Sequence, residues 1–255
     1  MMSFFNYHMP PFLNVMGAFY VLVAAPFLIS FLRQGYWSGV FSQLSRELYR
    51  YRLWIIPVLA LELLLIKFAD LPVTLWVKAL DDNIHAYTFW DFICSCAEGG
   101  FVAGFLFTIF MLANYFNKYK LSQVARISLM SSIYGGLANG VLKFIFNRQR
   151  PSIGLDQWHF FAFFESGAKH FGDLMYAYNS MPSGHTISTL AAIMPFFLAY
   201  QSKKIRIGLV IWALMVNFSR VYTINHWLSD VVMASILGII IGVAVFKVNE
   251  FRFKK

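Results

Sequence analysis

The chain has 255 residues, of which 59% are apolar and 13% charged, and its formal net charge is +9. Soluble globular proteins carry about 25% charged residues, so this composition excludes an ordinary soluble domain and indicates a membrane protein with several spans. The basic residues lie in short clusters between apolar runs. That pattern is typical of membrane topology and of contact with anionic lipids, so no nucleic-acid partner is expected.

Seven apolar segments have the length and composition expected of helices that cross a membrane. The chain is therefore predicted to be an all-α transmembrane helical bundle. Residues 1–52 would hold the first span and a basic linker, and residues 53–255 would form the core domain. An alternative with six spans keeps the first apolar run off the membrane. The seven segments are residues 12–32, 53–69, 100–116, 125–146, 186–201, 207–224 and 229–248.

Clusters of Lys and Arg orient the predicted bundle. They lie in residues 33–52, 117–126, 202–206 and 247–255, and a topology with seven spans puts all four clusters on one side. Because cytoplasmic loops carry an excess of Lys and Arg, we predict that this side is cytoplasmic. The N-terminus would then lie outside and the C-terminus inside.

Two long segments fall on the predicted outer side. Residues 70–99 combine aromatic residues with several aspartates, and are expected to form one or two short helices at the level of the lipid headgroups. Residues 147–185 are polar and aromatic and contain several glycines and prolines. A loop of this length inside a compact bundle is usually functional.

Three polar motifs interrupt the apolar pattern on this outer side. Each motif alone has an ordinary explanation: basic residues at a span end can snorkel, a serine can cap a helix, and a His–Asp pair can lie on a helix surface. Together they bring cations, two histidines and a helix N-terminus to one side of the membrane. That combination is suited to binding a phosphate group and displacing its ester. The motifs are Lys143 with Arg150-Pro151, then Pro182-Ser183-Gly184-His185, then Ser219-Arg220 with His226 and Asp230.

Cations and backbone amides are predicted to bind the phosphate. Arg150 and Arg220 can each hold two of its oxygens, and Lys143 adds a point charge. The amides at Ser183 and Gly184 open a predicted helix whose dipole favours an anion. Gly184 has no side chain to block a close approach.

The two histidines are predicted to divide the chemistry. Asp230 lies one helical turn beyond His226 and can accept its imidazole N–H, which favours His226 as a nucleophile that forms a phosphohistidine. His185 would protonate the leaving group and later activate water. No cluster of carboxylates of the kind that binds divalent metals accompanies them, so we expect neither a metal nor a cofactor.

The three motifs resemble the signature of the type 2 phosphatidic acid phosphatase (PAP2) superfamily. Every signature position is matched in order between about residues 143 and 230. The resemblance implies a six-helix core, to which the run 12–32 would be an addition. It also implies the same roles for these residues: a nucleophile at His226, an acid–base at His185, an orienting group at Asp230, and phosphate-binding groups at Lys143, Arg150, Ser183, Gly184 and Arg220.

The predicted function is that of an integral membrane lipid phosphate phosphatase in a bacterial inner membrane, with its active site on the periplasmic or extracellular face. The substrates considered are undecaprenyl pyrophosphate, phosphatidylglycerol phosphate, phosphatidic acid and lipid A, and the sequence does not choose among them. Two alternatives stay open: a phosphatase of small soluble phosphate esters, and a non-enzymatic anion transporter.

Two further features have weaker signals. Glu62 lies within a predicted span, where a carboxylate is a functional candidate by default, although a structural, helix-bonded Glu is equally consistent. Cys94 and Cys96 are two residues apart, a spacing that suits neither a structural zinc site nor an ordinary disulfide. They are expected to be small residues packed near a membrane interface.

Overall fold

The computed structural model describes residues 39–80, 84–162 and 177–250. The first predicted span, residues 12–32, lies outside these ranges. The chain from Val40 onward forms one compact unit, and the description that follows concerns this unit.

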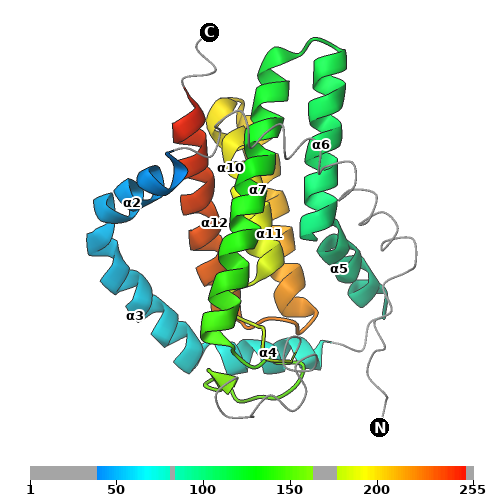
Figure 1. The fold of residues 1–255 in the computed structure, drawn as a ribbon. Coiled ribbons are helices and arrows are strands. Elements are labelled where there is room, and N and C mark those ends of the chain that lie inside the picture. Colours follow the sequence, from blue (N-terminus) through cyan, green and yellow to red (C-terminus); the bar gives the residue numbers. More distant parts are fainter. Residues whose placement is uncertain (1–38, 81–83, 163–176, 251–255) are drawn as a thin grey trace. The chain divides into compact units, whose positions relative to one another are not determined.

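The regular structure of the described ranges consists of helices, which confirms the predicted all-α class (Figure 1). In chain order the helices are α2 (Val40–Arg50), α3 (Arg52–Phe68), α4 (Asp70–Ala79), α5 (Ile84–Cys96), α6 (Gly99–Tyr115), α7 (Tyr119–Phe146), α10 (Gly184–Ala199), α11 (Lys203–Tyr222) and α12 (Leu228–Asn249).

Six of the predicted spans coincide with helices, namely α3, α6, α7, α10, α11 and α12. Of these, α7, α11 and α12 are each long and apolar enough to cross a membrane alone. The pair α5 and α6, bent by 59°, would make a fourth span if counted together, while α10 is apolar but shorter. The chain is thus a multi-pass membrane protein.

Helix α10 packs against α7, α11 and α12 (Figure 1). Glycines of α12 allow this contact: a Cβ added at Gly238 would lie 2.8 Å from the carbonyl oxygen of Ile187, and one added at Gly242 would lie 2.5 Å from Cβ of Met194. Small residues allow membrane helices to bring their backbones close together. This packing fixes the first turn of α10 beside the start of α12 and the end of α7.

Helices α3 and α4 support the same end of the bundle. Helix α3 buries Glu62 and Ile66, and exposes most of its other apolar side chains. Asp70 is the first residue of α4 and is fully buried. Because α4 packs against α11 and α12, the α3–α4 junction places the Asp70 carboxylate next to the start of α12. The described residues of the segment 70–99 form two short helices, α4 and α5, where one or two were predicted.

The other end of α12 is tied to α2 by an ion pair. Lys247 Nζ lies 2.7 Å from Oε1 of Glu47, whose side chain is buried. Gln43 donates a second hydrogen bond to the same oxygen. Helix α2, part of the predicted basic linker, therefore packs on the core at the end of the bundle far from the start of α12.

Candidate active site

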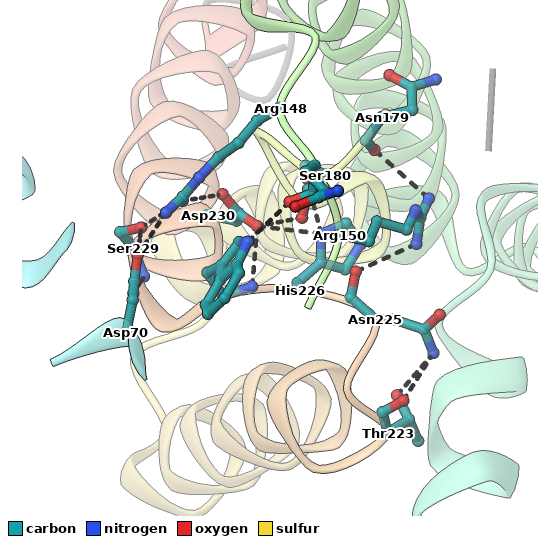
Figure 2. Close-up of polar contacts among 12 residues, drawn as sticks. Asp70, Arg148, Arg150, Asn179, Ser180, Thr223, Asn225, His226, Ser229 and Asp230 are labelled. Atoms are coloured by element: carbon teal, nitrogen blue, oxygen red, sulfur yellow. Dashed lines mark hydrogen bonds and ion pairs between the residues drawn. The ribbon is translucent and has the colours of Figure 1, made fainter. Parts of the chain in front are cut away.

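The three predicted motifs meet at one end of the bundle, where α7 ends, α10 begins and the loop from α11 enters α12. Backbone hydrogen bonds join the segments: Ser183 N–H donates to the carbonyl of Asp230 (3.2 Å), and Ser180 N–H donates to the carbonyl of Arg148 (3.0 Å). Residues distant in the sequence are thereby brought into one polar cluster (Figure 2).

Both arginines of the predicted motifs contribute guanidinium groups to this cluster. Arg150 donates to the carbonyl oxygens of Asn225 (3.2 Å) and Asn179 (3.4 Å). Arg220 contacts the Sγ atom of Cys94, and its buried Nε–H has no partner among the described residues. Both side chains are less than a tenth exposed, so their charges act with little screening by water. No pattern in the sequence predicts the contact with Cys94.

Electrostatic interactions connect the remaining predicted residues to these arginines. The charge of Lys143 interacts with those of Arg150, Arg220 and Asp230. The ring of His185 interacts with the charges of Arg220, Lys143 and Arg150, and with His226. The structure therefore brings together all of the predicted cations and both histidines.

Ser183 is the N-cap residue of α10, but its side chain does not cap the helix. The hydroxyl is buried and has no hydrogen-bond partner among the described residues. Ordinary helix capping therefore does not account for this serine. Its free hydroxyl and the first amides of α10, which have no intrahelical acceptor, are donors that could serve an anion.

Gly184 allows α10 to approach α7 closely. A Cβ at this position would lie 3.0 Å from Nδ2 of Asn139, which stands one helical turn before Lys143 on α7. The amide side chain of Asn139 thus belongs to the cluster, although no sequence motif singled it out.

The tautomer of His226 is set by a backbone carbonyl. Nδ1 lies 2.7 Å from the carbonyl oxygen of Ser180 and 3.7 Å from Oδ2 of Asp230. A carbonyl can only accept, so Nδ1 carries the proton and Nε2 has the free lone pair. This corrects the expectation that Asp230 accepts the imidazole N–H directly: the acceptor is Ser180, and Asp230 acts as a nearby charge.

His226 is held in its neutral form. Burial, and then the positive charges of Arg220, Arg150 and Lys143, lower the pKa of this imidazole well below its ordinary value of 6.5. A neutral ring with an unprotonated Nε2 is the form of histidine that can attack an electrophile.

Asp230 is occupied by other donors, which explains its distance from the ring. Its Oδ2 accepts the backbone N–H of Trp227 (2.9 Å) and the hydroxyl of Ser180. Its Oδ1 accepts a hydrogen bond from Arg148 Nη1 (2.6 Å). As the third residue of α12, the carboxylate also satisfies an amide at the helix start.

Arg148 is the main residue that the sequence motifs do not identify, because it stands between the signature positions Lys143 and Arg150. Its side chain is fully buried and lies between two carboxylates (Figure 2). Nη1 donates to Asp230 and to Ser229 Oγ (2.7 Å), and Nη2 donates to Asp70 Oδ2 (2.7 Å) and to the carbonyl of Gln157 (2.7 Å).

Glu62, the carboxylate expected within a predicted span, lies in α3. Both carboxylate oxygens of Glu62 are buried without a hydrogen-bond partner among the described residues. Within these same ranges, no three His, Cys, Asp or Glu side chains come together in a way that could hold a metal ion.

Comparisons with known proteins agree with the motif resemblance. A family model described as PAP2 superfamily matches residues 125–254. The chain is 24% identical over 169 residues to the lipid A 4'-phosphatase of Bacteroides thetaiotaomicron, a match that covers 62% of this chain and 68% of that protein. It is 34% identical over 71 residues to undecaprenyl-diphosphatase BcrC of Bacillus subtilis, covering 28% of this chain and 36% of that protein.

Two crystal structures share the fold. That of Aquifex aeolicus LpxE is 20% identical, with a TM-score of 0.50, and the match covers 70% of this chain and 94% of that one. That of the first transmembrane PAP2 type phosphatidylglycerolphosphate phosphatase from Bacillus subtilis is also 20% identical, with a TM-score of 0.57, covering 78% and 96%. Since the family model spans half of the chain and includes all three motifs, the chain belongs to the PAP2 superfamily.

Proposed function

We propose that this protein is a membrane lipid phosphatase that hydrolyses a phosphomonoester or pyrophosphate of a membrane lipid through a phosphohistidine intermediate. The observation that supports this most directly is the buried His226: its Nδ1 faces the Ser180 carbonyl, which leaves Nε2 unprotonated, and its ring interacts with the positive charges of Arg220, Arg150 and Lys143. A nucleophile surrounded by cations is suited to attack on a phosphate, because the cations stabilise the charge that develops on the phosphoryl oxygens.

In the proposed mechanism, Nε2 of His226 attacks phosphorus and the bond to the leaving oxygen breaks. His185, protonated once the anionic substrate offsets the charges of Lys143, Arg150 and Arg220, gives its proton to that oxygen, which leaves as the lipid alcohol or as a lipid phosphate. His185 then takes a proton from water, and the resulting hydroxide attacks phosphorus and breaks the P–N bond. Phosphate departs, and both rings regain their starting protonation states.

The donor set favours a mechanism without a divalent metal. The groups proposed to face the phosphate are two guanidinium groups, an ammonium group, backbone amides and the hydroxyl of Ser183. These groups would repel a divalent cation, whereas Mg²⁺ is normally held by carboxylates together with phosphate oxygens. Cationic side chains can supply the charge stabilisation that a metal supplies elsewhere.

A lipid substrate is favoured by the setting of the site in a multi-pass membrane bundle and by the relatives. Those proteins are named for lipid A, undecaprenyl diphosphate and phosphatidylglycerol phosphate. Each of these lipids carries a phosphate at the membrane surface, where the end of a transmembrane bundle can reach it.

Phosphate release from purified lipids tests this proposal. Wild-type protein in detergent should release phosphate from at least one of undecaprenyl pyrophosphate, phosphatidylglycerol phosphate, phosphatidic acid and lipid A. Vanadate, which mimics five-coordinate phosphorus, should inhibit competitively, and EDTA should have little effect. Faster release from glucose 6-phosphate than from any of the lipids would favour a phosphatase of soluble esters. No release from any substrate would favour an anion transporter.

We further propose that the site faces the periplasm or the cell exterior in a bacterial inner membrane. Helix α7 ends at the site and α10 begins there (Figure 1). Lys118 directly precedes α7, and Lys203 is the first residue of α11, which follows α10. The basic residues before α7 and at the start of α11, and Lys247 in the last turn of α12, therefore lie at the opposite end of the bundle. An excess of Lys and Arg is typical of the cytoplasmic side, which supports a cytoplasmic C-terminus.

Labelling with a membrane-impermeant maleimide tests this orientation. A cysteine placed at the exposed Lys204 should react in inverted inner-membrane vesicles and remain unlabelled in intact spheroplasts. A cysteine placed at the exposed Ser152, near the site, should behave in the opposite way. The unmodified chain, with Cys94 and Cys96, supplies the background. Labelling of Lys204→Cys from outside would reverse the proposed topology.

A further inference from the structure

A buried network of charged side chains lies next to His226, the proposed nucleophile, which it approaches through Asp230. It joins Asp70, Arg148 and Asp230, whose side chains are all 0% exposed. Arg148 Nη2 lies 2.7 Å from Asp70 Oδ2, and Arg148 Nη1 lies 2.6 Å from Asp230 Oδ1. One guanidinium thus bridges two carboxylates, and the three groups together carry a net charge of about −1.

The network is fully hydrogen-bonded and closed to water. Nε of Arg148 adds a bond to the carbonyl of Gln157 (3.2 Å), so each nitrogen of the guanidinium has a carboxylate, hydroxyl or carbonyl acceptor. The faces of the guanidinium are covered by the rings of Phe160, at 4.8 Å, and Trp227, at 5.3 Å. A charge held in this manner has one fixed position and interacts strongly with its neighbours.

Ser229 completes the connection to Asp70. Its backbone N–H donates to Asp70 Oδ1 (2.9 Å), and its hydroxyl donates to Asp70 Oδ2 (2.6 Å). Burial raises the pKa of the Asp70 carboxyl, while Arg148 and the two donors of Ser229 oppose that shift. With three donors pointing at it, the carboxylate is the form that this arrangement stabilises at neutral pH.

The charge of the network matters at the moment when His226 is phosphorylated. Bond formation at Nε2 leaves the ring cationic, with the proton still on Nδ1. Asp230 Oδ2, 3.7 Å from Nδ1, stabilises that cation. The positive charge of Arg148, which is bonded to Asp230, destabilises the cationic ring. The negative charge of Asp70, on the other side of Arg148, offsets this destabilisation.

We propose that Asp70 is a positioning residue for the phosphoryl transfer: through Arg148 it holds Asp230 in place and preserves the negative charge that faces His226. This inference rests on the proposed function. It assigns a role to the first residue of α4 and to an arginine between the ends of the first motif, neither of which contacts the nucleophile.

Asp70→Asn tests the proposal, because asparagine retains the shape of aspartate and can still accept from Ser229. With the four lipids named above, we expect kcat to fall about tenfold. KM and the inhibition constant of vanadate should stay within about twofold, since the phosphate-binding cations are untouched. A purely structural role for Asp70 would lower the yield or the melting temperature without producing this separation of kcat from KM.

Glu47→Gln is the matched control, because Glu47 is also a buried carboxylate in an ion pair, with Lys247 at the other end of the bundle. It should leave kcat unchanged per folded molecule. A value of kcat for Asp70→Asn within twofold of wild type, or a loss confined to KM, would overturn the proposal. Absence of wild-type turnover on every lipid would instead overturn the proposed function.

A double variant, Asp70→Asn with Arg148→Gln, separates charge from geometry. It removes one negative and one positive charge, and so restores the net charge of −1 through Asp230 alone. Its kcat should exceed that of Asp70→Asn and stay above about one tenth of the wild-type value. Because the double variant contains no uncompensated arginine, it also serves as the test if the single variant does not fold. A kcat no higher than that of Asp70→Asn or, if the single variant does not fold, below about one tenth of wild type would contradict the charge argument.

Discussion

Replacement of His226 by asparagine is expected to abolish phosphate release, with a loss of about 10⁴-fold or more, as for the nucleophile of other covalent mechanisms. Asparagine can still donate a hydrogen bond toward the Ser180 carbonyl, which now receives the Nδ1 proton. The variant should therefore fold and still bind vanadate through Arg150 and Arg220. What it lacks is the Nε2 lone pair that attacks phosphorus.

Trapping the intermediate distinguishes this role from general damage to the site. Wild-type protein mixed briefly with ³²P-labelled substrate and quenched in alkali should retain label that is released by acid, as expected of a phosphohistidine. His226→Asn should retain none. His159→Asn is the control, because the His159 carbonyl accepts a hydrogen bond from Gln149 N–H, within the first motif, while its side chain has no role in the mechanism. Label on the His226 variant would refute the assignment of the nucleophile.

Much of the fold was predictable from the sequence because the membrane restricts the possibilities. Apolar runs of this length must form helices to satisfy their backbone groups, and six predicted runs coincide with helices whose ends differ from the predicted bounds by at most six residues. The two short helices in residues 70–99 also followed from their mixed aromatic and acidic composition. The hydrophobic pattern does not predict which helices pack against one another. Helix α10 contacts both α7 and α12, and its close contact with α12 depends on glycines such as Gly238, whose neighbours the sequence does not reveal.

Contacts between residues close in the sequence were easier to predict than contacts between residues that only the tertiary fold brings together. The four-residue separation of His226 and Asp230 placed the carboxylate near the ring. It could not reveal that the Ser180 carbonyl lies closer, because Ser180 belongs to a loop 46 residues away. The partnership of Asp70 with Arg148 was likewise beyond a sequence pattern. Only the folded chain brings these two residues, 78 positions apart, to 2.7 Å.

Arg148→Met is expected to give the largest loss of stability among single substitutions in this region. The change leaves Asp70 and Asp230 as two buried carboxylates without their cation, and removing one partner of a buried ion pair typically costs about 3–5 kcal/mol. For a chain of this size, that corresponds to roughly 10 °C in melting temperature. Thermal unfolding in detergent, followed by circular dichroism or by an intrinsic fluorescence signal, measures the shift.

The pH dependence of this loss identifies its electrostatic origin. Without Arg148, burial should raise the pKa of Asp70 further above the ordinary value of 3.8, so the folded variant binds protons that the unfolded chain has released. Its stability then falls as pH rises, and the deficit relative to wild type should be greater at pH 8 than at pH 5. Arg50→Met, at a side chain that is 62% exposed, should cost less than about 1 kcal/mol at either pH. A deficit for Arg148→Met that is equal at the two pH values would mean that lost packing, and not unpaired buried charge, destabilises the variant.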